Sequence, residues 1–233
     1  ETQPFFAFLS IIQNFSLGVL CKALHNRPGD SKYIDEHTAG LPGKEVRTVD
    51  DSQIIDLFFA RSELAISELD AKYGKVCHKL AHNILDSRQD AEECVNDAYL
   101  GTWNAIPPQR PDPLLPFVCV LVRRYSIMRY RANTAMKRNS SYDACMEEIE
   151  NCIAAPGRVE DHYEAKVLAR TIERFLDTLN RENRVIFMRR YWYSDSYAAI
   201  AALTGLTEKN VSVRLARVRK QLRDYLMKQG VLT

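Results

Sequence analysis

Residues 197–222 read YAAIAALTGLTEKNVSVRLARVRKQL, a pattern typical of two helices joined by a tight turn. Residues 197–203 predict a short helix whose alanines allow a close neighbour. Gly205 lies where the turn needs a positive φ angle, and Thr207 is a good N-cap for the second helix. The stretch therefore predicts a helix-turn-helix at the end of the chain.

The second of these helices has two different faces. Val211, Leu215, Val218 and Leu222 form an apolar stripe at spacings of four, three and four residues. At about 100° per residue, the opposite face is small at its centre and cationic at its edges. Such a face suits the major groove of DNA, which is about 12 Å wide. The alternative is an ordinary amphipathic helix with a solvated basic face. The residues predicted to contact DNA are Lys209, Ser212, Val213, Arg214, Ala216, Arg217 and Lys220.

A second predicted helix, residues 90–106, reads DAEECVNDAYLGTWNAI. Its small and apolar residues, from Ala91 to Thr102, share one face, whereas Leu100 and Trp103 point largely the other way. Large apolar side chains on the outside of an acidic helix are typical of a protein interface. The alternative, equally supported by this helix alone, is that Trp103 folds back against Tyr99 or the Pro-rich run that follows.

A third predicted helix lies within residues 116–138, PFVCVLVRRYSIMRYRANTAMKR. It mixes two tyrosines with arginines, and aromatic rings among cations suit unstacked bases and a phosphate backbone. The segment 114–142 contains six cations and no acidic residue, which favours nucleic acid over a core helix with a solvated end.

The remaining pattern predicts an all-α chain of two small helical domains. Helical periodicity begins near Asp51, and one continuous helix is expected to reach Leu69. Residues 143–164 carry seven acidic residues against one arginine and are expected to form a linker or a weak helix. The expected domains are 49–138 and 165–233, joined by an acidic linker at 139–164. Residues 1–48 are expected to be a dispensable extension outside the functional fold; the alternative is a membrane-binding or partner-binding helix in its apolar part, residues 5–24.

Composition narrows the function classes. Apolar residues make up 46% of the chain and charged residues 27%, as expected for packed cores in water. Six scattered cysteines without a CxxC pair fit a reducing cytoplasm. Cys77, His78 and His82 lack a second ligand pair, so no metal site is predicted. No nucleophilic triad or Gly-rich phosphate loop is visible. We therefore expect a protein that is not an enzyme, with no cofactor and no small-molecule substrate.

Three predicted elements, in their order and spacing along the chain, resemble the extracytoplasmic-function (ECF) sigma factors of bacterial RNA polymerase. They are the helix at residues 90–106, the helix within residues 116–138 and the helix-turn-helix at residues 197–222. DAEECVNDAYLGTW looks like their polymerase-binding helix, LVRRYSIMRYRANTAMKR like their promoter-melting helix, and residues 181–226 like the domain that reads the −35 element. The resemblance covers about residues 49–228, and it implies that Val49 is a plausible start of the natural chain. It implies core RNA polymerase and promoter DNA as partners, and allows an anti-sigma factor as a third.

The resemblance also assigns residues to each contact. The clamp helices of polymerase would face Asp90, Glu93, Asn96, Asp97, Leu100 and Trp103. The −10 strand would lie near Arg124, Ser126, Arg129, Tyr130 and Arg131. The −35 groove would face the seven residues of the carboxy-terminal helix named above. The family usually has Asn at the place of Arg124 and Asp at that of Met128, so the −10 preference is open. The rival interpretation is a free-standing helix-turn-helix regulator, which has no need of an exposed Leu100–Trp103 face.

Overall fold

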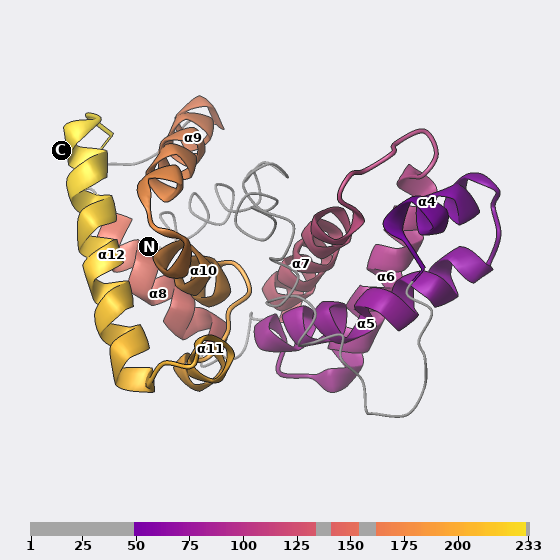
Figure 1. The fold of residues 1–233 in the computed structure, drawn as a ribbon, viewed down its shortest axis with the longest axis horizontal. Coiled ribbons are helices and arrows are strands. Elements are labelled where there is room, and N and C mark those ends of the chain that lie inside the picture. Colours follow the sequence, from indigo (N-terminus) through magenta and orange to yellow (C-terminus); the bar gives the residue numbers. More distant parts are fainter. Residues whose placement is uncertain (1–48, 134–140, 154–161, 232–233) are drawn as a thin grey trace. The chain divides into compact units, whose positions relative to one another are not determined.

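The computed structural model describes residues 49–133, 141–153 and 162–231. These residues form nine α-helices and no strand, in two compact units (Figure 1). The predicted all-α fold is thus confirmed over the described ranges. The expected extension 1–48, and Lys137 and Arg138 of the basic segment, lie outside them. No helix in the described part of the chain is long and apolar enough to cross a membrane.

The amino-terminal unit contains four helices: α4 (Asp51–Phe59), α5 (Leu64–Ile84), α6 (Arg88–Ala105) and α7 (Leu114–Asn133). Helices α5, α6 and α7 pack against one another, and α4 packs on α5. Asp51 ties three of these helices together. Its carboxylate accepts hydrogen bonds from Lys72 Nζ (2.7 Å) and Tyr73 OH (2.6 Å) on α5, and from the Leu114 amide (3.2 Å) on α7.

The expected continuous helix from Asp51 to Leu69 is wrong, because the chain turns between α4 and α5. Arg61 adopts a positive φ of 52° there, and the Ser62 amide donates back to the Leu57 carbonyl at 3.0 Å. The Arg61 guanidinium donates to the Trp103 carbonyl at 2.6 Å. The turn between α4 and α5 is therefore accompanied by a long-range contact with α6, and the local sequence pattern does not predict it.

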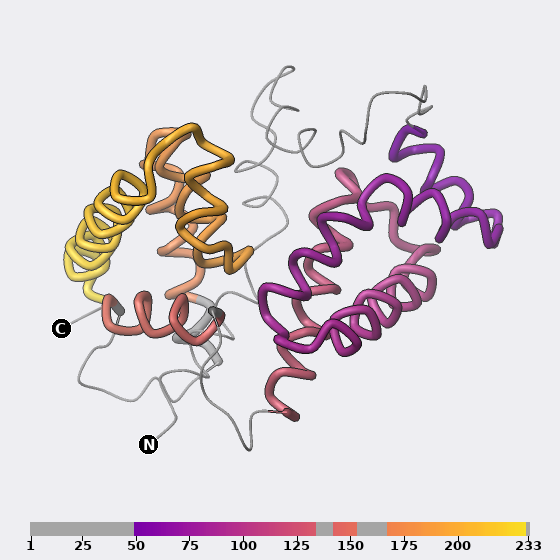
Figure 2. The backbone as a smooth tube through the Cα atoms, turned by 90° about the horizontal axis from the view of Figure 1, so that it is seen from below, coloured from indigo at the N-terminus to yellow at the C-terminus, as the bar shows by residue number. Residues whose placement is uncertain are grey.

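The carboxy-terminal unit contains α8 (Ser141–Ile153), α9 (His162–Thr178), α10 (Arg181–Tyr191), α11 (Tyr197–Thr204) and α12 (Glu208–Lys228). The long helix α12 packs against each of the other four (Figure 2). Its inner stripe is fully buried at Val211, Leu215 and Leu222. A single core built around α12 thus holds this unit together.

The structure differs from the expected acidic linker over residues 141–153, which form the helix α8 of the carboxy-terminal unit. Tyr142, Cys145 and Ile149 are fully buried and Met146 is 1% exposed. These four residues recur at helical spacings of three, one and three, so they form one apolar stripe. Acidic residues surround this stripe in the sequence and hide it, but the four acids of residues 141–153 lie on a helix that also has an apolar face to bury.

Candidate nucleic-acid and protein interfaces

The helix pair α11–α12 has the local geometry that its sequence predicts. Gly205 ends α11 in the left-handed conformation with φ of 69°. Thr207 caps α12, since its Oγ1 accepts the Asn210 amide at 3.2 Å. Ser196 caps α11 in the same way through the Ala199 amide. These caps set where both helices begin, and hence which residues of α12 face outward.

The outer face of α12 is exposed at nearly all of its predicted DNA-contacting positions. Lys209, Ser212, Val213, Ala216, Arg217 and Lys220 are all exposed. Val213 and Ala216 keep the centre of this face small. Arg214 is less available, because it pairs with Glu182 of α10 and keeps 33% of its side chain exposed. The face therefore presents a shallow centre with cations on its edges.

A partly buried ionic cluster, which the sequence pattern does not predict, joins four helices of the carboxy-terminal unit. Glu148 of α8 accepts hydrogen bonds from Arg190 Nη2 (2.5 Å), Tyr191 OH (3.1 Å), Tyr197 OH (2.9 Å) and Arg219 Nη1 (3.1 Å). We call these five residues the Glu148 cluster. Burial raises the pKa of Glu148, but hydrogen bonding and the charge of Arg190 outweigh it and hold the pKa below its ordinary value. At neutral pH the Glu148 carboxylate is therefore charged, and both of its oxygens accept hydrogen bonds within the cluster.

Helix α6 presents the predicted acidic face. Its inner residues Ala91, Cys94 and Val95 are buried, as are Ala98 and Thr102. Glu93, Asn96 and Asp97 are exposed, and Leu100 is 57% exposed although it is apolar. Asp90 lies half-buried in the first turn, where its carboxylate accepts Asn133 Nδ2 of α7 at 2.9 Å. Glu93, Asn96, Asp97 and Leu100 therefore lie on the solvent-exposed side of α6, whereas Asp90 is engaged by α7.

Trp103 is not a free-standing exposed ring. It is half-buried and meets the Phe58 ring edge-on, with centroids 6.1 Å apart. The Arg61 guanidinium lies over the Trp103 ring, 5.3 Å from its centroid. The indole thus folds back within the unit, as the alternative reading held, but its partners come from α4 and the turn after it rather than from Tyr99 or the Pro-rich run.

The five predicted −10 residues of α7 divide into two groups. Arg124 and Arg131 are exposed and Arg129 is partly exposed. Ser126 is fully buried and Tyr130 is 9% exposed, so these two side chains belong to the core of the unit. Arg129 is itself engaged by α6, at 2.7 Å from Glu93 Oε2 and 3.6 Å from Asp90 Oδ1. Glu93 and Asp90, which the resemblance assigns to polymerase, therefore pair with Arg129, which it assigns to DNA.

Among the described residues, no group of three or more histidine, cysteine or acidic side chains is placed to hold a metal. Cys77 is fully buried in the core, and His78 lies 3.9 Å from Asp70. The five described cysteines are all buried and reduced.

Two protein-family models match the chain. The model described as Sigma-70 region 2 matches residues 69–136, and the model described as Sigma-70, region 4 matches residues 169–222. No curated protein matches. Among solved structures, the chain is similar to CnrH in its complex with the cytosolic domain of CnrY, with 20% identity and a TM-score of 0.34 over 76% of this chain and 97% of that one. The two family matches fall on α5–α7 and α9–α12, so the chain carries a sigma-70 region 2 domain followed by a sigma-70 region 4 domain.

Proposed function

We propose that this chain is an ECF-type sigma factor, which binds core RNA polymerase and directs transcription initiation at specific promoters. The observation that carries the proposal is the joint presence of region 2 and region 4 domains in one chain, with an exposed, small-centred cationic face on the last helix. Core polymerase would supply the active site and its metals, so this chain would act by binding alone, in the cytoplasm.

Helix α12 would enter the −35 major groove. Its exposed Ser212, Val213 and Ala216 would leave room for base edges, and the exposed Lys209, Arg217 and Lys220 would contact the phosphates that line the groove. Phosphate contacts position a recognition helix and base contacts give specificity. Arg214 would reach DNA only after it leaves Glu182, and it therefore has the weaker support.

Helix α6 would contact polymerase through Glu93, Asn96, Asp97 and Leu100. An exposed leucine among acidic residues supports this, because a contact centred on Leu100 would remove apolar surface from water while the acids pair with cations on the partner. Trp103 would act from behind this face by fixing α6 against α4. Asp90 would contribute through its pairing with Arg129 and Asn133.

Helix α7 would bind the −10 strand through its exposed arginines. Arg124 and Arg131 project from the unit, and the Arg124 guanidinium lies 5.5 Å from the Tyr125 ring centroid. Arg129 would join them once a partner takes up Glu93 and Asp90. The buried Ser126 and Tyr130 would shape this surface without touching DNA.

Titration of the purified chain with core RNA polymerase tests the proposal. We expect a complex of one chain per core enzyme that Leu100→Asp weakens by at least tenfold, since the variant places a charge where apolar surface would be removed from water. Tight promoter binding by the chain alone, with no affinity for core polymerase, would instead identify a free-standing helix-turn-helix regulator.

A further inference from the structure

Helix α8 belongs to neither family match, yet it is part of the carboxy-terminal unit. It lies between residues 69–136 and 169–222, the two matched segments. Its residues 141–153 include four acids and no base. Helix α12, which it contacts, carries seven cations and two acids. A segment of strong negative charge therefore rests on the helix assigned to DNA.

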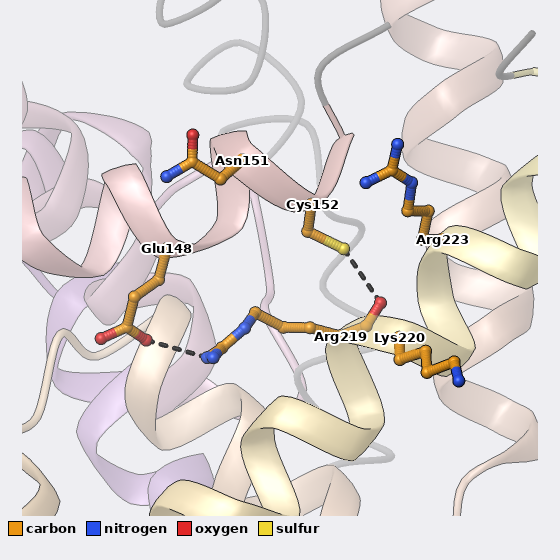
Figure 3. A pocket seen from close by; sticks show the side chains of 6 residues that line it. All are labelled: Glu148, Asn151, Cys152, Arg219, Lys220 and Arg223. Atoms are coloured by element: carbon orange, nitrogen blue, oxygen red, sulfur yellow. Dashed lines mark hydrogen bonds and ion pairs between the residues drawn. The ribbon is translucent and has the colours of Figure 1, made fainter.

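The docking of α8 on α12 is specific. Arg219 Nη1 donates to Glu148 Oε2 at 3.1 Å and to the Tyr191 hydroxyl oxygen at 2.6 Å. One turn further along α8, the Cys152 thiol donates to the Arg219 carbonyl at 2.9 Å (Figure 3). The apolar stripe of α8 from Tyr142 to Ile149 is buried in the core of the carboxy-terminal unit. Hydrogen bonds, charge and apolar burial thus act together to keep α8 in place.

The docked helix lies along one edge of the predicted DNA face. Arg219 and Arg223 follow Ser212 and Ala216 on α12 at spacings of four, three and four, so these four residues form one row along the helix. The hollow between α8 and α12 is lined by Arg219, Lys220 and Arg223 together with Glu148 and Asn151 (Figure 3). DNA that follows this row beyond Ala216 would therefore meet the acids of α8 within a Debye length, about 8–10 Å at physiological salt.

We propose that α8 is an intramolecular acidic competitor of DNA. Docked on α12, it holds Arg219 away from phosphates and repels the backbone along this edge. The exposed centre of the α12 face is open to DNA with α8 in place, but DNA contact along the edge at Arg219 requires α8 to leave α12. This inference rests on the proposed DNA-binding role of α12 and adds a means by which the free chain avoids non-specific DNA.

The first test measures the affinity of the full chain for a non-specific DNA duplex over a range of salt concentrations. Glu148→Gln weakens the hold on Arg219 and should add one phosphate contact. The slope of log affinity against log salt should then become steeper by about 0.9, and binding at about 0.1 M salt should tighten roughly eightfold. Glu63→Gln makes the same charge change at an exposed site in the other unit and should leave both values unchanged.

A second variant covers the case in which Glu148→Gln fails to fold. Glu147 is exposed on α8 and outside the Glu148 cluster, so Glu147→Gln should keep the fold. Removing one charge at about 10 Å in water should tighten DNA binding about twofold. Equal affinities for wild type, Glu147→Gln and every folded Glu148 variant would overturn the competitor role while leaving DNA binding intact.

Hydrogen exchange gives an independent readout of the movement. Amides of residues 141–153 should be protected in the free chain and should lose that protection in the DNA complex, while those of α12 stay protected. Unchanged protection of α8 in the complex would overturn the inference. An absence of DNA binding by all variants would instead refute the proposed function of α12, and this inference with it.

Discussion

Replacing Trp103 with alanine should destabilise the amino-terminal unit rather than remove a direct contact with polymerase. The indole makes an edge-on contact with Phe58 and lies beneath Arg61. The aromatic pair contributes about 0.5–1.5 kcal/mol beyond buried area, and an exposed cation–π contact about 0.5–1 kcal/mol. With the buried area lost, the unit should lose about 2–3 kcal/mol. For a unit of this size, its melting temperature should fall by roughly 8–24 °C.

Leu100→Ala, on the same helix, is the matched control for Trp103→Ala. Leu100 is 57% exposed, so Leu100→Ala should change stability by no more than about 0.5 kcal/mol. If α6 is the polymerase contact, burial of Leu100 against the partner contributes about 1–2 kcal/mol, and the variant should bind core polymerase about fivefold to thirtyfold more weakly.

The assay combines peptide-resolved hydrogen exchange of α5–α7, for stability, with titration of core polymerase below the melting temperature of each variant. We expect Trp103→Ala mainly to lower the amide protection of α5–α7. Leu100→Ala should lower only the affinity for core polymerase. Unchanged amide protection of α5–α7 in Trp103→Ala, together with a large loss of polymerase affinity, would refute the packing argument and make Trp103 a contact residue. Normal polymerase binding by Leu100→Ala would remove the case for this face of α6.

Three further predictions concern the carboxy-terminal unit. Arg217→Ala should leave polymerase binding intact, lower run-off transcription from a promoter with a −35 element, and reduce the salt slope of DNA binding by about 1; an unchanged slope would show that Arg217 touches no phosphate. Gly205→Ala should cost about 1–2 kcal/mol in urea unfolding, because its φ is 69° while its missing Cβ would meet open space; a neutral effect would count against the turn. Because the pKa of Glu148 is lowered from 4.5, its stabilisation is complete above about pH 5 and falls as the pH drops through the folded-state pKa. Urea unfolding followed by Trp192 fluorescence in a Trp103→Phe background should show this loss, and Glu148→Gln should remove it; the same acid dependence in that variant would assign it to another group.

Much of the carboxy-terminal unit is predictable because its signals are local. Gly205 and Thr207 act through backbone conformation and a cap three residues away, and the stripe from Val211 to Leu222 follows helical periodicity. Each of these features needs only the residues near it in the chain. The same holds for the inner face of α6, whose buried residues recur at helical spacing.

The features that escape the sequence depend on distant partners. The turn at Arg61 and the packing of Trp103 depend on contacts between segments about 42 residues apart. The Glu148 cluster joins residues separated by 42 to 71 positions, and no pattern along the chain reveals such a pairing. The family resemblance assigns Ser126 and Tyr130 to DNA, but their positions on α7 turn both side chains into the core. The apolar stripe of α8, at residues 142, 145, 146 and 149, is present in the sequence, but the acidic composition around it favours a linker.

Run-off transcription with purified core polymerase tests the central claim most directly. Templates carrying promoters selected with this chain should give transcripts from defined start sites only when the chain is added, and substitutions in the −35 element should abolish them. Arg217→Ala and Leu100→Asp should each reduce the product, the first at the step of promoter recognition and the second at the step of polymerase binding. Transcripts that are the same with and without the chain, on every template that it binds, would contradict the proposal that it is a sigma factor.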